Sequence, residues 1–304
     1  MESFDPVTRQ GLAITNLFGL ELAISGVLLA VVVVWLGMAV LRFRARPADA
    51  TEPAPVHGNR RLELIWTLTP AAILVVVFFL VIETMRSVNA SAADAQPIRV
   101  VGHQWWWEFD YPNLQVVTAN ELHVPVGASL QVSLQSVDVI HSFHVPQFGW
   151  MRDAIPGKTN QMSIFVDRQG AFAGTCNQYC GLQHAWMRVL VVAESADQFS
   201  TWVRQQQQSV TPSGVRGEQV FLQNTCVNCH TIRGVSQMGN VGPDLTHVGS
   251  RTTLGSGVVD NTADNLGRWL RNPSSIKPGV LMPAYQSLSA ADLTALVDYL
   301  ESLK

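Results

Sequence analysis

The chain has 304 residues, enough for about two domains of ordinary size. Only 14% of the residues are charged and 47% are hydrophobic, which excludes a disordered chain. The net charge of −3 excludes a strongly basic nucleic-acid-binding protein, so no nucleic-acid partner is expected. Four cysteines are too few for a disulfide scaffold, and their spacing does not fit one.

Two uncharged apolar stretches predict a transmembrane helical hairpin over residues 1–90, with spans at about 15–42 and 64–84. Buried core helices are the alternative. Arginines gather in the short loop between the stretches, and arginine-rich short loops stay in the cytoplasm. We therefore expect a multi-pass protein of the bacterial inner membrane, embedded in the lipid bilayer, with both termini and the C-terminal domains on the periplasmic side. The N-terminus shows no basic region or small-residue cleavage site, so no cleaved signal peptide is expected.

Short alternating segments predict an all-β domain over residues 96–195. Residues 130–135 alternate strictly between apolar and polar, and residues 162–166 and 187–192 have the composition of further strands. Several short strands over about 100 residues indicate an antiparallel sandwich or barrel. A helix and a glutamine-rich linker are predicted for residues 196–213, and an all-α domain for residues 214–304.

Four metal-binding side chains share one loop: Cys176, Cys180, His184 and Met187, with His141 upstream. One thiolate, two imidazoles and a weak methionine make a mononuclear blue-copper site. A second thiolate allows two sulfurs to bridge two copper ions, with one imidazole on each. Met187 and a main-chain carbonyl would then take the weak axial positions. The pattern predicts a two-copper centre; a Cys176–Cys180 disulfide and a zinc site are the alternatives, and the methionine argues against zinc.

The run Cys226-Val-Asn-Cys229-His230 matches the C-x-x-C-H signature of covalent haem attachment. The two thiols would add to the haem vinyl groups, and His230 would be the proximal iron ligand. So short a pattern also occurs in thioredoxin-like and zinc sites. The extracytoplasmic all-α domain favours haem.

The second axial ligand of such a haem is usually methionine. Met282 lies in a loop before the last predicted helix, which favours it over Met238, close to the attachment motif. The carbonyl of Pro243 is the expected acceptor for the His230 ring N–H.

Together these features resemble subunit II of cytochrome c oxidase, and the fused haem module makes the chain similar to the caa-type branch of haem–copper oxidases. The resemblance rests on residues 66–70, 102–107, 138–142 and 176–187. It implies a multidomain membrane protein with a two-helix transmembrane hairpin, an all-β cupredoxin-like sandwich and an all-α cytochrome c domain. The implied cofactors are dinuclear copper (CuA) and one covalently bound haem c. The implied CuA ligands are His141, Cys176, the Gln178 backbone carbonyl, Cys180, His184 and Met187.

The resemblance also assigns roles outside the ligand set. Trp105 matches the aromatic residue that accepts electrons from cytochrome c. Glu63 matches a glutamate at the entrance of a proton path, with an interfacial charge as an equal alternative. Gln178 departs from the glutamate that binds magnesium at the contact with subunit I in many members. A neutral amide is a weaker ligand for a hard cation, which argues against magnesium here and leaves the carbonyl free to serve CuA.

The implied function is to receive electrons for a terminal cytochrome c oxidase. Electrons would pass from cytochrome c or a similar donor via haem c and CuA to the catalytic subunit I, which reduces oxygen to water with proton translocation. Subunit III is a further expected partner. The main alternative is the corresponding subunit of a CuA-type nitric oxide reductase. A copper carrier would give no reason for the haem motif, and a haem redox sensor would need a cytoplasmic output domain.

Overall fold

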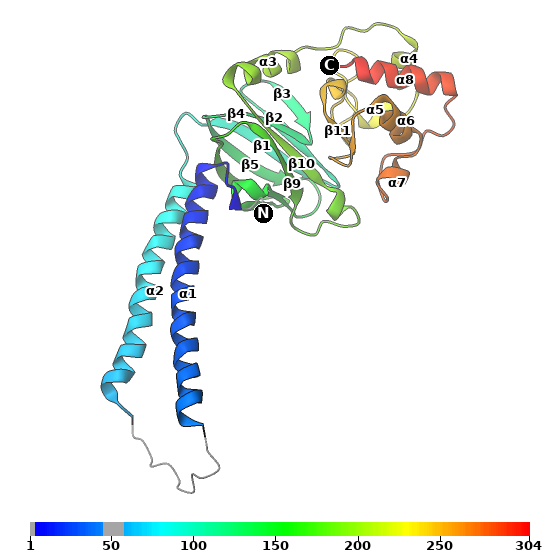
Figure 1. The fold of residues 1–304 in the computed structure, drawn as a ribbon. Coiled ribbons are helices and arrows are strands. Elements are labelled where there is room, and N and C mark those ends of the chain that lie inside the picture. The colour runs from blue at the N-terminus through cyan, green and yellow to red at the C-terminus, as the bar shows by residue number, and fades with distance from the viewer. Residues whose placement is uncertain (1–3, 45–57) are drawn as a thin grey trace. The chain divides into compact units, whose positions relative to one another are not determined.

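The computed structural model describes residues 4–44 and 58–304 (Figure 1). The chain divides into two compact units, one formed by Leu12–Asn89 and the other by Met1–Gly11 together with Ala90–Lys304. Each unit is described by itself below.

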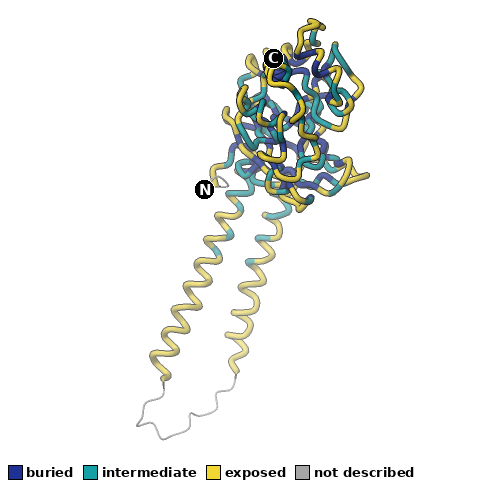
Figure 2. The backbone as a smooth tube through the Cα atoms, turned by 90° about the vertical axis from the view of Figure 1, so that its right-hand side faces the viewer, coloured by how far each residue is buried: buried dark blue, intermediate teal, exposed yellow. Residues whose placement is uncertain are grey.

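Two long helices make up the first unit, α1 (Arg9–Phe43) and α2 (Arg60–Asn89). Both are long and apolar enough to cross a membrane, and none of their most apolar window is buried. In Figure 2, both helices have the colour of exposed residues over most of their length. Apolar side chains on every face are the pattern of a helix surrounded by lipid. Pro70 lies within α2, ten residues after its start.

The second unit contains a β-sandwich of two five-stranded sheets, ordered β3-β2-β1-β5-β8 and β4-β10-β9-β6-β7. Side chains along β5 alternate between half-buried and buried, as the sequence pattern predicts for a strand with one face in the core. The strands are β1 (Gln96–His103), β2 (Trp106–Tyr111), β3 (Val116–Ala119), β4 (Glu121–Pro125), β5 (Ser129–Ser136), β6 (His141–His144), β7 (Met151–Ala154), β8 (Asn160–Phe165), β9 (Gly170–Cys176) and β10 (Arg188–Glu194).

The expectation of a purely antiparallel sandwich is wrong in one respect. β1 pairs with β5 and β4 pairs with β10 in parallel, while the other pairs within the two sheets are antiparallel. Parallel neighbours need a crossover connection. Here the strands that lie between each parallel pair in sequence make that connection, and they occupy other places in the two sheets. The core between the sheets holds large, fully buried rings, among them Trp107, Phe109 and Phe143.

Residues ahead of the first span also belong to the sandwich unit. Val7 is buried, its carbonyl accepts the N–H of Asp167 and its N–H donates to Gln147. Thr8 forms an isolated antiparallel bridge with Val166, and its hydroxyl donates to the Phe148 carbonyl at 3.0 Å. The N-terminal segment thus completes one edge of the sandwich.

A helical module follows the sandwich. Helix α3 (Ala196–Gln206) starts with a capping box at Ser195 and places Phe199 and Val203 in the sandwich core. Helix α8 is capped by Ser289, whose hydroxyl accepts the N–H of Asp292, as expected. A small hairpin that the sequence did not indicate lies between the helices, formed by β11 (Thr253–Leu254) and β12 (Val259–Asp260). The module's helices are α4 (Arg216–Gln223), α5 (Cys226–Cys229), α6 (Ala263–Arg271), α7 (Pro273–Ile276) and α8 (Ala290–Ser302); short 3₁₀ helices of the unit are Pro146–Phe148, His184–Trp186 and Val248–Ser250.

Candidate metal and haem sites

The loop after β9 brings the two upstream cysteines close to two imidazoles. The Sγ atoms of Cys176 and Cys180 lie 3.8 Å apart, well beyond the length of a disulfide bond. The Cys176 sulfur lies 3.9 Å from Nδ1 of His141, and the Cys180 sulfur lies 3.6 Å from Nδ1 of His184. Each sulfur therefore faces one imidazole nitrogen of its own.

Two weaker donors complete the cluster. The Gln178 carbonyl oxygen lies 3.2 Å from the Cys176 sulfur, and the Met187 sulfur lies 3.9 Å from the Cys180 sulfur. A metal ion bound to both a sulfur and a nitrogen at about 2.0–2.3 Å would place these two atoms 3.6–3.9 Å apart when the bond angle is tetrahedral or somewhat wider. Thiolate, imidazole and thioether together favour copper. The residues present therefore fit a copper centre, and all six predicted ligands lie in one place.

Asp138 orients the upstream histidine. His141 is fully buried at the start of β6, and its Nε2 lies 2.8 Å from a carboxylate oxygen of Asp138, which turns Nδ1 toward the sulfurs. The backbone N–H groups of Gln104 and Val139 also donate to Asp138. Burial works against the carboxylate, but these hydrogen bonds outweigh it and lower the pKa of Asp138. Such a carboxylate fixes the tautomer of a ligand histidine.

Contacts within the cluster shift the pKa values of its thiols and of one imidazole. The hydrogen bond between the two thiols lowers the pKa of Cys176 and raises that of Cys180. Burial opposes protonation of His141, but its contacts with Cys176 and Asp138 outweigh burial and raise its pKa. The lowered pKa of Cys176 favours its thiolate, the form that binds metal.

Trp105 contacts the loop that carries Cys180 directly. Its indole Nε1 donates to the carbonyl of Cys180 at 2.9 Å, and the Gln104 side chain donates to the same oxygen at 2.7 Å. The neighbouring Trp107 is fully buried and packs edge-on against His141, with ring centroids 5.9 Å apart. Trp106 stacks on His103, with ring centroids 4.0 Å apart.

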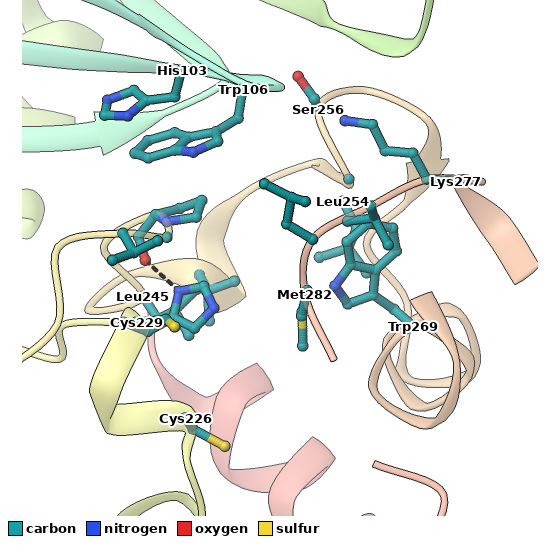
Figure 3. Close-up of a pocket in the computed structure, with 18 of the residues that line it drawn as sticks. His103, Trp106, Cys226, Cys229, Leu245, Leu254, Ser256, Trp269, Lys277 and Met282 are labelled. Carbon is teal, nitrogen blue, oxygen red and sulfur yellow. Dashed lines mark hydrogen bonds between the residues drawn. The ribbon is translucent and has the colours of Figure 1, made fainter. Parts of the chain in front are cut away.

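A cavity of about 730 Å³, within the usual size range of cofactor pockets, is lined mostly by the helical module and on one side by sandwich residues such as His103 and Trp106 (Figure 3). Cys226, Cys229, His230 and Met282 all line it. Figure 3 shows Met282 on the side of the cavity opposite the attachment motif. By contrast, Met238 is 80% exposed. The residues present therefore fit a covalently attached haem with two axial ligands.

His230 is held by a main-chain carbonyl, as expected. Its Nδ1 lies 2.8 Å from the Pro243 oxygen, which leaves Nε2 free for the cavity. Burial lowers the pKa of His230 and so favours the neutral imidazole that binds metal. A Cβ on Gly242 would collide with the His230 ring, so glycine permits this close approach.

Two residues singled out in the sequence have exposed side chains, and three residues that contact the sites or the residues that line them were not singled out. Glu63 is exposed on α2, in the unit formed by the helical hairpin. The Gln178 side chain is exposed. Sequence reasoning gave no role to Asp138, Lys277 or Glu121; only Asp138, three residues before a predicted ligand, carried a local signal.

Comparisons with known proteins cover nearly the whole chain. The family model for the transmembrane domain of cytochrome c oxidase subunit II matches residues 6–83, the model for its periplasmic domain matches residues 114–194, and a cytochrome c model matches residues 214–304. A cytochrome c oxidase subunit 2 from Alkalihalophilus pseudofirmus is 34% identical, covering 100% of this chain and 91% of the relative. The chain belongs to the cytochrome c oxidase subunit II family.

The chain is also similar to a second curated relative and to a solved structure. Cytochrome c oxidase subunit 2 from Bacillus subtilis is 32% identical over 87% of this chain and 81% of the relative. The crystal structure of the periplasmic domain of subunit II of cytochrome oxidase from Bradyrhizobium japonicum is 31% identical, covers 38% of this chain and 95% of that chain, and has a TM-score of 0.37.

Membership confirms the predicted family and fold class: two apolar N-terminal helices, a cupredoxin-like β-sandwich and a helical cytochrome c domain. The chain is a membrane protein and part of a haem–copper oxidase, which is an oxidoreductase. The family and the cytochrome c domain imply copper and haem, and subunit II implies other oxidase subunits as partners.

Proposed function

We propose that this chain receives electrons for a terminal cytochrome c oxidase and relays them from a c-type donor, via haem c and CuA, to subunit I. Its C-terminal domains would lie on the periplasmic side of the bacterial inner membrane. The observation that carries the proposal is the pair of sulfurs 3.8 Å apart, each facing one imidazole, in a chain that also holds a C-x-x-C-H motif beside a cavity.

The copper domain's residues would hold two ions in a fixed, dry setting. When bound, the copper pair and the haem iron each take up and release single electrons. Cys176, Cys180, His141 and His184 would hold the ions. Asp138 keeps the His141 ring in one orientation, and full burial of that ring excludes water. A site that moves little between oxidation states favours fast transfer.

The helical module's residues would hold the haem. Cys226 and Cys229 would attach it, while His230 and Met282 would bind the iron. The Pro243 carbonyl keeps the His230 ring oriented. Trp105, whose indole donates to the Cys180 carbonyl, would be the first residue of the copper domain to receive electrons.

Oxygen reduction and proton translocation would take place on the partner subunits. Subunit I would hold the oxygen-reducing site, and subunit III would complete the complex. Glu63, exposed on α2, would lie at a proton-path entrance or serve as an interfacial charge. Gln178 offers no charge to a magnesium ion, so none is assigned there.

The test is removal of one sulfur at a time from the assembled oxidase. Cys176→Ser and Cys180→Ser should each abolish the near-infrared absorption and the copper hyperfine pattern, while the haem bands persist. Wild-type oxidase should contain two coppers per haem c in addition to the copper of its oxygen-reducing site. Tyr179→Phe, an exposed ring in the same loop, is the matched control and should keep the copper signal. A copper signal that survives either cysteine variant would overturn the proposal.

A further inference from the structure

A buried carboxylate of the copper domain holds the hairpin of the helical module. Glu121 lies at the start of β4 and is only 2% exposed. One of its oxygens accepts the backbone N–H groups of Thr252 and Thr253 at 2.8 and 3.0 Å. The same oxygen accepts both threonine hydroxyls, at 2.7 and 3.3 Å.

The hairpin tip makes a second set of contacts with the copper domain. Ser256 is 2% exposed, and its hydroxyl lies 2.9 Å from the Arg188 carbonyl and 3.0 Å from the Asn120 side-chain oxygen. That Asn120 oxygen also accepts the backbone N–H of Trp107, whose ring packs against His141. Ser256 has a φ of +68°, between two glycines that are also left-handed, so the sequence favours this tight tip.

A third contact lies across the cavity. Lys277, 3% exposed, donates from Nζ to the Trp105 carbonyl at 2.8 Å. Gln183, 1% exposed, donates to the carbonyls of Lys277 and Pro278 at 3.2 and 3.0 Å. This loop leads to Met282, and the cavity between the contacts is lined by Trp105 and Trp106 as well as by the haem motif.

Buried polar groups are costly unless they are paired, so these side chains favour one arrangement of the two domains. All four donors that the described residues supply to Glu121 are uncharged groups. Salt screens exposed charges strongly and buried hydrogen bonds very little. The contact therefore differs from the salt-sensitive charged surfaces that soluble electron carriers use to find a partner.

We propose that Glu121 is the positioning residue that docks the cytochrome c module on the copper domain, so that the haem cavity stays against Trp105 and Trp106. The inference rests on the proposed function. In the step that it serves, the reduced haem loses one electron and the oxidised copper pair gains it. No bond is made or broken, and the c-type donor supplies the next electron.

The experiment compares Glu121→Ala, Glu121→Gln and Asp94→Ala in the assembled oxidase. Asp94 is an exposed carboxylate ahead of β1 and serves as the control. Glu121→Ala should increase hydrogen exchange of residues 252–257 about tenfold or more, and slow haem-to-copper electron transfer after flash reduction by a similar factor. Glu121→Gln keeps an acceptor oxygen and should stay within about threefold of wild type, and Asp94→Ala should match wild type.

Several readouts separate positioning from loss of the cofactor sites. Copper and haem spectra, both reduction potentials and the donor-to-haem rate should be unchanged in Glu121→Ala. Wild-type haem-to-copper transfer should be independent of ionic strength. If Glu121→Ala does not fold, the double variant Thr252→Val and Thr253→Val removes the two hydroxyl donors from the other side and should slow transfer at least threefold.

Unchanged exchange or unchanged transfer in Glu121→Ala, or unchanged transfer in the double threonine variant if Glu121→Ala does not fold, would overturn the docking role while leaving the proposed function intact. Transfer in wild type that falls steeply with salt would also overturn it. Absence of the copper signal from wild-type protein would instead overturn the proposed function, so the two failures are distinguishable.

Discussion

Replacing Gly102 with alanine should disturb one copper ligand and leave the haem alone. A Cβ at this position of β1 would lie 2.7 Å from Cδ2 and 3.0 Å from Cγ of the His141 ring. Ordinary contact begins at 3.4 Å, so the ring or the strand must move by about 0.7 Å. The ring cannot move freely, because it is fully buried and held by Asp138.

The cost of such overpacking is about 1–3 kcal/mol. For a unit of this size, each kcal/mol lowers the melting temperature by roughly 2–4 °C. Copper titration followed by electron paramagnetic resonance should show weaker binding and an altered hyperfine pattern in Gly102→Ala. Gly267→Ala is the control, because its Cβ would meet only Val297 at 3.7 Å, and alanine within α6 should stabilise the helix by about 0.5–1 kcal/mol. Wild-type copper binding and melting in Gly102→Ala would refute the reasoning.

Three further predictions concern the helical module. Met282→Leu should change the haem's optical spectrum, while the same change at the exposed Met238 should not; equal spectra would exclude Met282 as a ligand. Gly242→Ala should press on the His230 ring and reduce the yield of attached haem on haem-stained gels, with copper content unchanged. Burial lowers the pKa of Lys277 from 10.5 to about 7. Between these pH values the unfolded chain carries the lysine charge and the folded chain does not. The stabilising effect of a neutral buried lysine should therefore be complete above about pH 10.5 and lost as the pH falls toward 7. Wild-type melting temperature should therefore rise over this window relative to Lys277→Met, and a constant difference would contradict the burial argument.

The cluster of proposed copper ligands could be predicted from the sequence because most of them are close together along the chain. Residues 176–187 hold four of the five side-chain donors, and the haem motif is contiguous. Metal and haem ligation demand particular side chains at particular spacings, and such a spacing can be recognised in the sequence without knowledge of the fold. The long apolar spans are equally local, since each one needs only enough consecutive uncharged residues to cross a bilayer.

Contacts between distant segments could not be predicted in the same way. Glu121 and Thr252 are 131 residues apart, and neither lies in a pattern that marks a docking residue. Strand alternation indicates which face is buried but not which strand lies alongside, so the parallel pairing of β1 with β5 was missed. The β11–β12 hairpin has strands of two residues each, too short to give a periodic signal.

The backbone contacts of Val7 and Thr8 with the sandwich have a consequence for biogenesis. The sandwich draws on chain from before the first span and on chain from after the second. Those two stretches can meet only if they emerge from the same face of the bilayer. A copy with one span wrongly inserted would leave Val166 and Phe148 without their contacts with Thr8.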